Sequence, residues 1–472
     1  MNSDGNTGHT LSRRSFLHSG AACALATTLT GRTVHSQPID RTGDGMSITI
    51  DHVDSDFERE PLIRPFGFKG GYLTEIWQTA ARMKSASGKT ATGLCTQSVL
   101  WSDAAVFAGH SESGGNALMF ALTEYALRRS KGMTFRSPVD LQEALLDDVH
   151  EYGMRITGNP NLRKTFTLNA LVGFDNAAWL LYARDNDMRT FDGMIPAEYR
   201  PALSSRHERV ACIPLMSYAV PVREIKQAAD DGFFFMKIKI GQPGTPAEML
   251  EKDMARLTEI HRAIGTMRTP YSAVGKLPYY FDANGRYPDT DTLRRLLDHA
   301  DSIGALEQIA IIEEPFPEEY ETDVSGLGVR IAADESAHTD TDALARIQMG
   351  YSAIALKPIA KTLSMTLKIA AVAKERSVPC FCADLTVNPI LVDWNKNVAA
   401  RLDAFPGLDA GLLETNGHQN YKAWDTMTGY HPCTGSSWTT VKNGMFELDS
   451  DFWEKSGGIF LPSDHYDAMF TH

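Results

Sequence analysis

The chain has 472 residues, of which 43% are hydrophobic and 22% charged, and this composition is typical of a soluble globular protein rather than of a disordered chain. Acidic residues outnumber basic ones by 59 to 46, giving a formal net charge of −13 at pH 7. That charge argues against a general nucleic-acid-binding or anionic-membrane surface, because both need a basic face. The length suffices for a barrel of roughly 250 residues and a second domain.

The first segment resembles a signal for export by the twin-arginine route. Arg13 and Arg14 stand in Ser-Arg-Arg-Ser-Phe-Leu, which precedes a weakly apolar, alanine-rich run and then a polar stretch. The run is far shorter than the roughly 20 residues that span a bilayer, so no membrane insertion of the mature form is expected. The simpler alternative is a disordered tail with a chance arginine pair. Residues 1–36 are therefore predicted to be a signal peptide, which places the mature chain in the periplasm or another extracytoplasmic space.

The next part of the chain predicts an α+β domain over residues 45–205. Short stretches of alternating polar and apolar residues, separated by glycine-containing turns, indicate a small sheet over residues 51–95. Helical periodicity follows over residues 116–129, 139–152 and 165–185.

From residue 210 onward short apolar strands alternate with helices, which predicts a parallel (β/α)8 barrel of the TIM type over residues 206–423. The eight expected strands are residues 211–218, 234–240, 279–283, 310–314, 330–334, 353–357, 379–383 and 410–414. The expected helices are residues 250–264, 291–303, 340–349, 363–376 and 390–402. The glycine-rich, aromatic residues 424–472 are expected to pack on the N-terminal domain.

Two further segments are expected to shape a pocket. Residues 265–277 are rich in turn formers and longer than a typical connection, so they predict a surface insertion. Residues 101–115 are interpreted as a loop that contains His110 and Glu112. A plain surface histidine is the simpler interpretation of His110.

Acidic residues stand where successive apolar strands end. Asp282 ends the third expected strand, Glu313 lies at the end of the fourth, and Asp334 ends the fifth. In a barrel the carboxyl ends of the strands meet at one rim, where the active site lies. Three carboxylates there would repel one another unless a cation lay between them, and hard oxygen ligands favour Mg²⁺, with Mn²⁺ also possible. The sequence thus predicts a metal site, although any one of these acids alone would be interpreted as a solvated strand end.

Three lysines lie beside this predicted metal site. Lys237 and Lys239 are two apart in the second expected strand, so their side chains share a face, which is the barrel interior. Lys357 ends the sixth expected strand after an apolar run. Burial and nearby cations both lower a lysine pKa, so these side chains are expected to supply a neutral amine as a base. A lone buried lysine would more simply be the partner of an acid.

Five motifs follow one another in this order: Lys-x-Lys, Asp-Ala-Asn, Glu-Glu-Pro, Ala-Asp-Glu-Ser and Leu-Lys-Pro-x-x-Lys. Together they resemble the enolase superfamily, specifically its muconate lactonizing enzyme and mandelate racemase group. Within that group they resemble the lysine-lysine branch, which contains dipeptide epimerases. The pattern covers residues 210–416, and the N-terminal domain is similar to the capping domain of that superfamily. The resemblance implies a small-molecule carboxylate substrate and a homo-oligomer.

The resemblance also implies roles for individual residues. Asp282, Glu313 and Asp334 would bind Mg²⁺. Lys239 and Lys357 would be acid/base groups on opposite faces of the substrate, and Lys237 would lie beside the substrate carboxylate and lower the pKa of Lys239. Supporting partners of the ligands would be Asn284 and Glu335.

The sequence departs from the superfamily pattern at two strands. The seventh reads Cys-Phe-Cys-Ala-Asp-Leu and ends in Asp384, without the histidine that sugar-acid dehydratases of the superfamily use. The eighth ends in Glu414, without the Asp-x-Asp by which many dipeptide epimerases hold the substrate ammonium. Glu414 would either hold an ammonium or pair with a lysine, and Asp384 and Glu414 are both assigned to the surroundings of the substrate.

The expected function is therefore abstraction of the proton α to a substrate carboxylate through an enediolate. Two opposed lysines favour a racemase or epimerase, an isomerase that would act on an amino acid, an N-acyl amino acid or a dipeptide. A cycloisomerase, or an acid-sugar dehydratase or other lyase, is the alternative within the superfamily. The alternative from another class is a non-catalytic sugar- or peptide-binding barrel, which retention of the complete charged set disfavours.

Overall fold

A computed structural model describes residues 46–68 and 71–471 of the chain. The predicted signal peptide, residues 1–36, lies outside the described residues, so export by the twin-arginine route stays a prediction. All described residues fall in one compact unit. Within these ranges, no helix combines the length and the apolar character that crossing a membrane requires.

The N-terminal domain contains an antiparallel sheet with the strand order β3-β2-β1-β4. Its strands are β1 (Ile48–Phe68), β2 (Gly71–Ser85), β3 (Thr90–Gln97) and β4 (Thr134–Phe135). Strands β1 and β2 form one long hairpin, because a register shift between Pro61 and Phe66 lets the pairing continue through the proline. The short strands expected from the sequence are therefore longer here. Gly93 permits close packing of the sheet on a helix, since a Cβ atom there would lie 2.2 Å from the backbone of Gly173.

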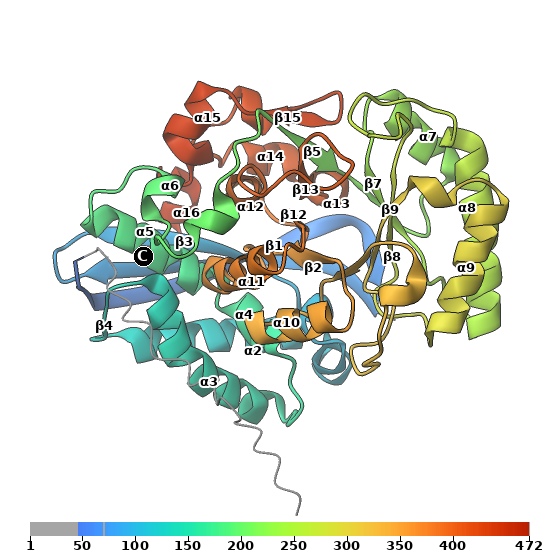
Figure 1. Cartoon of the computed structure of the whole chain (residues 1–472). Helices are drawn as coiled ribbons and strands as arrows, with labels where there is room; N and C mark the ends of the chain where they lie inside the picture. Colours follow the sequence, from blue (N-terminus) through green and yellow to red (C-terminus); the bar gives the residue numbers. More distant parts are fainter. Residues whose placement is uncertain (1–45, 69–70, 472) are drawn as a thin grey trace, which may run out of the picture. The chain divides into compact units, whose positions relative to one another are not determined.

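Helices cover one face of this sheet (Figure 1). They are α1 (Val99–Ser102), α2 (Ala104–Ser130), α3 (Pro138–Thr157), α4 (Lys164–Ala170), α5 (Val172–Asp185) and α6 (Phe191–Met194). Two expectations were wrong. Residues 101–115 are mostly helical rather than a loop, because Asp103 caps α2 by accepting hydrogen bonds from two backbone amides. The single helix expected over residues 165–185 is divided at Leu171 into α4 and α5.

The second sheet closes into the predicted (β/α)8 barrel. Its strands are β5 (Arg209–Ile213), β6 (Leu215–Met216), β7 (Met236–Lys239), β8 (Tyr279–Asp282), β9 (Ile309–Glu313), β10 (Ile331–Ala333), β11 (Ala353–Leu356), β12 (Cys380–Cys382) and β13 (Gly411–Glu414). They pair in parallel in the order β5-β13-β12-β11-β10-β9-β8-β7-β6. Only Pro214 separates β5 from β6, and its carbonyl accepts a hydrogen bond from the Lys237 amide, so both segments belong to one strand and the ring is complete.

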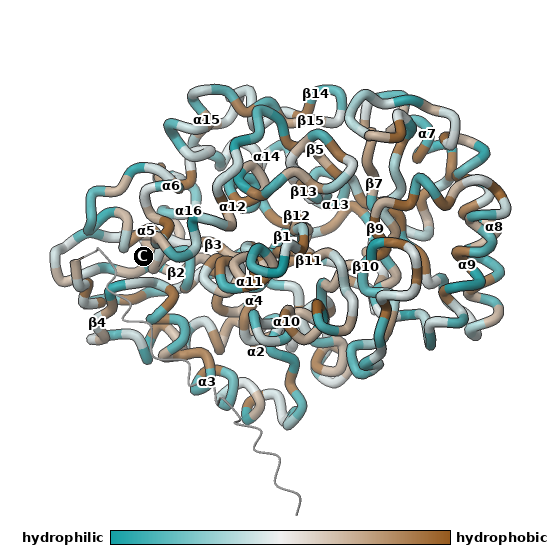
Figure 2. Tube along the Cα trace, in the orientation of Figure 1, coloured by the Kyte–Doolittle hydropathy of each residue, from teal (hydrophilic) through white to brown (hydrophobic). Residues whose placement is uncertain are grey.

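Helices alternate with the barrel strands. They are α7 (Val222–Asp230), α8 (Pro246–Ile264), α9 (Thr290–Ser302), α10 (Asp340–Gln348), α11 (Leu363–Glu375) and α12 (Pro389–Ala399). Each helix that the sequence predicted is present, whereas the short α7 was missed. Helices α8 and α9 alternate hydrophilic and hydrophobic residues (Figure 2), which is why their periodicity could be read from the sequence. Short 3₁₀ helices are η1 (Arg200–Leu203), η2 (Leu306–Gln308) and η3 (Ser325–Leu327).

The last part of the chain contacts both domains. Its elements are α13 (Gly417–Asn420), α14 (Trp424–Thr428), η4 (Ser437–Thr439), β14 (Val441–Lys442), β15 (Met445–Glu447), α15 (Ser450–Lys455), η5 (Ser456–Gly458) and α16 (Asp464–Ala468). Strand β15 pairs antiparallel with β5 of the barrel. The Asp467 carboxylate accepts hydrogen bonds from Arg82 and Thr92 of the N-terminal sheet, both at 2.8 Å.

A buried carboxyl group joins α5 to the start of α11. Asp175 accepts hydrogen bonds from the hydroxyl of Ser364 at 2.5 Å and from its backbone amide at 3.1 Å. Trp179 donates to the same hydroxyl at 3.0 Å. Burial raises the pKa of Asp175 from 3.8 to about 7, and the hydrogen bonds only partly offset this. The contact lies at the start of α11, which follows β11 and Lys357, so it fixes the N-terminal domain next to this part of the barrel.

This raised pKa predicts a pH-dependent contribution to stability. A carboxyl that holds its proton more tightly when folded stabilises the fold fully below its unfolded pKa, and this stabilisation is lost as the pH rises from about 4 through about 7. The Asp175→Asn variant keeps a neutral acceptor, so its stability relative to the unmodified protein should increase from pH 5 to pH 8. Thermal unfolding of both proteins across this range measures the difference. A difference that does not change with pH would contradict the assignment.

Candidate active site

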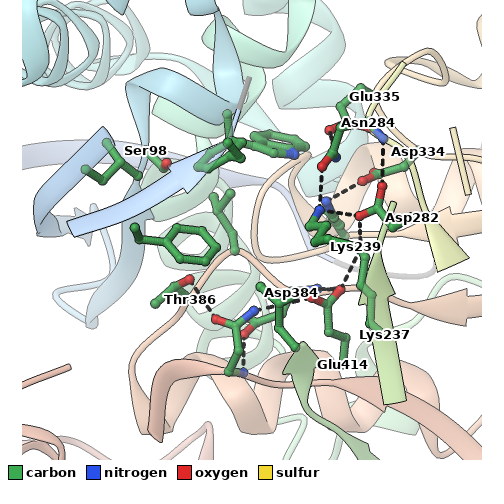
Figure 3. Close-up of a pocket in the computed structure, with 18 of the residues that line it drawn as sticks. Ser98, Lys237, Lys239, Asp282, Asn284, Asp334, Glu335, Asp384, Thr386 and Glu414 are labelled. Atoms are coloured by element: carbon green, nitrogen blue, oxygen red, sulfur yellow. Dashed lines mark hydrogen bonds and ion pairs between the residues drawn. The ribbon is translucent and has the colours of Figure 1, made fainter. Parts of the chain in front are cut away.

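The predicted strand-end residues meet at one rim of the barrel. Lys239 lies opposite Asp282 in the pairing of β7 with β8, and Asp282 lies opposite Glu313 in the pairing of β8 with β9. Asp334 and Lys357 follow directly after β10 and β11. All five are buried. Lys239, Asp282, Asp334 and Lys357 line one pocket, and Figure 3 shows the first three of these side chains close together there.

Three carboxylates at this rim could share a cation. Oxygen atoms of Glu313, Asp334 and Glu335 all lie within 4.8 Å of one another. Buried, hard oxygen donors at this spacing fit the chemistry of Mg²⁺. Asp282 is outside this compact set, and its Oδ2 atom is 2.9 Å from the Nζ of Lys237 and 2.5 Å from the Nζ of Lys239. Glu335, which the resemblance implied to be a supporting residue, is thus as well placed as the predicted ligands. The assignment of Asp282 as a ligand stays a prediction.

Two strand-end residues in the left-handed region organise the acids. Asn284 has φ +44° and Glu314 has φ +41°. Asn284 accepts a hydrogen bond from Lys239 at 2.5 Å and donates to Glu335 at 3.0 Å, so it links a predicted base to the acidic group. Glu314 accepts from the backbone amides of Asp334 and Ser336, at 2.8 and 3.2 Å. Burial, with the nearby Glu335 charge, raises the pKa of Glu314 to about 7.

The lysines are already paired with these carboxylates. The Nζ of Lys237 lies 2.8 Å from Glu313 and 3.1 Å from Glu414. The Nζ of Lys357 lies 2.5 Å from Asp334 and 4.6 Å from the centre of the Trp101 ring. Each ammonium therefore has at least one anionic partner within hydrogen-bonding distance.

The expected lowering of the lysine pKa is wrong for two of these residues. Burial alone lowers the pKa of Lys237, but Asp282, Glu313 and other carboxylates outweigh it and raise the pKa well above its ordinary value. Burial also lowers the pKa of Lys357, but the charges of Asp334 and of other carboxylates outweigh it and raise the pKa above its ordinary value. The sequence showed the neighbouring cations but not the distances to the anions, and these distances decide the sign.

Lys361 and Tyr280 support the acidic group from outside the predicted set. Lys361 donates to the backbone carbonyls of Asp334 at 2.5 Å and of Ala337 at 3.0 Å, which fixes the loop after β10. Burial lowers the pKa of Lys361. The Tyr280 hydroxyl donates to Glu313. Lys361 had a sequence signal, since it completes the Leu-Lys-Pro-x-x-Lys motif, whereas Tyr280 lies in an ordinary apolar strand.

The two acids of the seventh and eighth strands bond to one another's loops. Glu414 accepts from Lys237, from the Asp384 amide at 3.0 Å and from the Asn416 side chain at 3.3 Å. Asp384 accepts from the Asn416 amide at 2.8 Å. Burial, together with the charge of Glu414, raises the pKa of Asp384 to about 7. Of the two roles considered for Glu414, the structure shows the lysine partner.

The N-terminal domain supplies an apolar wall of the same pocket. Phe66 and Phe68 of β1, Leu73 and Ile76 of β2, and Trp101 of α1 line it. Glu112 supports this hairpin, since its carboxylate accepts hydrogen bonds from the amide and hydroxyl of Thr74, both at 2.7 Å.

One expectation about the pocket is confirmed and another is corrected. His110 is an exposed surface histidine, as the simpler interpretation predicted, and it donates to the Thr157 carbonyl at 2.9 Å. Residues 265–277 precede β8 and therefore lie at the opposite end of the barrel, where Ser272 pairs with Leu408. A position before a strand, rather than after it, excludes the active rim.

Comparison with known proteins agrees with this architecture. Residues 221–419 match the family model described as enolase C-terminal domain-like. This barrel is an enolase-superfamily domain. The predicted superfamily and fold are thereby confirmed, together with the expectation of an enzyme of this superfamily. A search of curated proteins finds no match.

Solved structures of similar fold include several members of the superfamily. A dipeptide epimerase from Enterococcus faecalis, in complex with Mg and the dipeptide L-Leu-L-Tyr, shares 17% identity at a TM-score of 0.58, over 85% of this chain and 97% of that chain. The L-Ala-D/L-Glu epimerase from Bacillus subtilis shares 18% identity at a TM-score of 0.57, over 79% of this chain and 91% of that chain. A mandelate racemase/muconate lactonizing protein from Herpetosiphon aurantiacus shares 17% identity at a TM-score of 0.58, over 85% and 96%. At these identities the likeness shows the fold alone.

Proposed function

We propose that this chain is a magnesium-dependent racemase or epimerase, an isomerase that removes and returns the proton α to a substrate carboxylate. The observation that carries the proposal is the placement of two lysines on either side of the acidic group. Lys239 ends β7 and Lys357 follows β11. Of the three strands between them, β8 ends in Asp282, β9 ends in Glu313, and β10 is followed directly by Asp334. A substrate held over these acids would lie between two potential proton carriers.

Each residue has a distinct role in this proposal. Glu313 and Asp334, with Asp282 or Glu335, would hold the cation, and Mg²⁺ bound there would stabilise negative charge developing on the substrate carboxylate. Lys239 and Lys357 would remove the proton from one face and return it to the other. Lys237 would keep positive charge beside the carboxylate, consistent with its raised pKa. Asn284 would orient Lys239 through its hydrogen bond at 2.5 Å.

Two observations favour an epimerase over the alternatives. Of the described residues, those that line the pocket include no histidine, so the acid used by sugar-acid dehydratases of the superfamily has no counterpart there. The similar solved structures include dipeptide epimerases, two of them described as complexed with Mg and a dipeptide. A cycloisomerase needs one base only, so it would leave the second buried lysine without a proton-transfer role.

Exchange of the α-proton tests the proposed function. In heavy water with Mg²⁺, the purified protein is expected to replace the α-proton of at least one compound from a panel of dipeptides, N-acyl amino acids and sugar acids, as followed by NMR. Excess chelator should abolish the exchange, and added Mg²⁺ should restore it. Metal binding without exchange on any compound would favour a non-catalytic barrel.

A further inference from the structure

The pocket is divided into a charged floor and an apolar roof. The floor carries the lysines and carboxylates of the barrel rim (Figure 3). The roof consists of Phe66, Phe68, Leu73, Ile76, Trp101 and Leu385. Phe66 and Leu73 are paired across β1 and β2, and the rings of Phe66 and Phe68 are 5.4 Å apart, so the aromatic part of the roof is continuous. A substrate anchored by its carboxylate on the floor would place its remaining atoms against this roof.

Hydrogen bonds to the barrel fix the roof in place. Leu62 forms a bridge with Tyr421, and the Tyr421 hydroxyl donates to the Thr386 carbonyl at 2.5 Å. The Gln78 side chain donates to that hydroxyl at 2.7 Å. The hairpin is therefore attached to the loops after the seventh and eighth strands, and the apolar surface it presents is part of the pocket as built.

The acids at the ends of the seventh and eighth strands already have partners within the protein. Both oxygens of Asp384 accept from backbone amides, those of Asn416 at 2.8 Å and Val387 at 3.4 Å. Glu414 bonds to Lys237 and to the Asn416 side chain. An ammonium group brought under the roof would lose its water and would have to displace these bonds to find an anion, which is unfavourable in a buried site.

From these contacts we infer that the substrate is a carboxylate whose remaining part is apolar and uncharged, as in an N-acylated amino acid with an apolar side chain, rather than a dipeptide with a free ammonium. The inference rests on the proposed function for the position of the carboxylate. Phe66, Phe68, Leu73 and Ile76 are the residues that select this class.

Two matched pairs of compounds test the inference. Propionyl-L-leucine and L-alanyl-L-leucine differ only in the ammonium group, and propionyl-L-leucine and propionyl-L-asparagine differ in the polarity of a side chain of similar size. In the presence of Mg²⁺, equilibrium binding by calorimetry and α-proton exchange by NMR are measured for each compound. Propionyl-L-leucine is expected to bind and exchange at least about 10-fold better than either partner, the discrimination typical of an apolar pocket.

Variants locate the selectivity in the roof. Phe68→Ala should raise the Kd or KM for propionyl-L-leucine about 10-fold with a smaller change in kcat. Phe68→Asp should reduce or reverse the preference over L-alanyl-L-leucine. Ile63→Ala is the matched control, since Ile63 belongs to the same strand but is 59% exposed, and it should leave both compounds unaffected.

The outcomes separate this inference from the proposed function. Exchange that favours L-alanyl-L-leucine or propionyl-L-asparagine would overturn the inference and leave the epimerase proposal intact. Selective binding of propionyl-L-leucine that Phe68→Ala weakens, without exchange on any compound, would support the inference about the pocket and contradict the proposed reaction. An equal effect of Ile63→Ala and Phe68→Ala would also overturn the assignment to the roof.

Discussion

Replacing Lys239 or Lys357 with methionine is expected to abolish α-proton exchange from one enantiomer of a substrate while partly preserving exchange from the other. Lys239 ends β7 and Lys357 follows β11, with three strands between them, so in the proposed reaction each lysine would reach only one face of the α-carbon. Loss of a positioned acid or base costs on the order of 10²- to 10⁴-fold in rate. The two variants should therefore lose opposite enantiomers, and exchange rates measured separately for the L and D forms in heavy water show the pattern.

The structure offers controls for this experiment. Lys374 is on α11, the helix that follows β11 and Lys357. Its Nζ atom lies 2.6 Å from the Asp403 carboxylate on the outer surface. Lys374→Met should leave both exchange rates unchanged. Calorimetric Mg²⁺ binding and thermal unfolding of the two active-site variants show whether the acidic group is intact. Variants that lose both enantiomers equally, with metal binding retained, would contradict a two-base epimerase and favour a one-base reaction such as cycloisomerisation.

The barrel and its active rim were predictable because their signals are local. A short apolar run followed by Asp282, Glu313 or Asp334 can be recognised without knowing what the strand pairs with. The repeated order of strand and helix then places every strand end at the same rim. Even so, the first strand is divided at Pro214 into β5 and β6, and its pairing depends on long-range contacts. Strand β5 pairs with β13, and β6 pairs with β7.

Other features of the site depend on distances that the sequence does not contain. Asn284 and Glu314 have a left-handed backbone, and the Asn284 side chain donates to Glu335, which lies with Glu313 and Asp334 in the acidic group. The raised pKa of Lys237 arises from acids that are 45 to 177 residues away in the chain. The apolar roof comes from Phe66 and its neighbours in a hairpin that the sequence indicated only as short strands. Long-range pairing, rather than propensity, determined each of these results.

A buried ion pair outside the active site joins the C-terminal segment to the barrel. On α12, the Nζ of Lys396 lies 2.5 Å from Asp393 and donates to the Trp438 carbonyl at 2.7 Å. His431 lies 2.8 Å from the other oxygen of Asp393. The Nδ1 atom of His431 accepts a hydrogen bond from the Cys433 amide at 2.9 Å, which holds the ring beside Asp393. Burial lowers the pKa of Lys396, and the charge of Asp393 and the hydrogen bond to it only partly oppose this effect.

Breaking this pair is expected to destabilise the fold strongly. Both side chains of the Lys396 and Asp393 pair are no more than 2% exposed, so Lys396→Met leaves a buried carboxylate with only His431 beside it. Removal of one partner from a buried ion pair typically costs about 3–5 kcal/mol, whereas replacement of both by apolar residues is often close to neutral. The double variant Lys396→Met with Asp393→Leu should therefore recover much of the stability lost in the single variant. Denaturant unfolding of both variants gives the two free energies.

The exposed pair of Lys455 with Asp451 separates burial from charge in this test. Their nitrogen and oxygen are 2.9 Å apart, a distance similar to that in the buried pair, but the side chains are 48% and 56% exposed. Water solvates both groups when the pair is broken, so Lys455→Met should not change the unfolding transition measurably. Equal destabilisation by Lys455→Met and Lys396→Met would show that the buried group does not anchor the C-terminal segment. A stable Lys396→Met protein with the C-terminal segment released to limited proteolysis would show that the segment, rather than the whole barrel, depends on the pair.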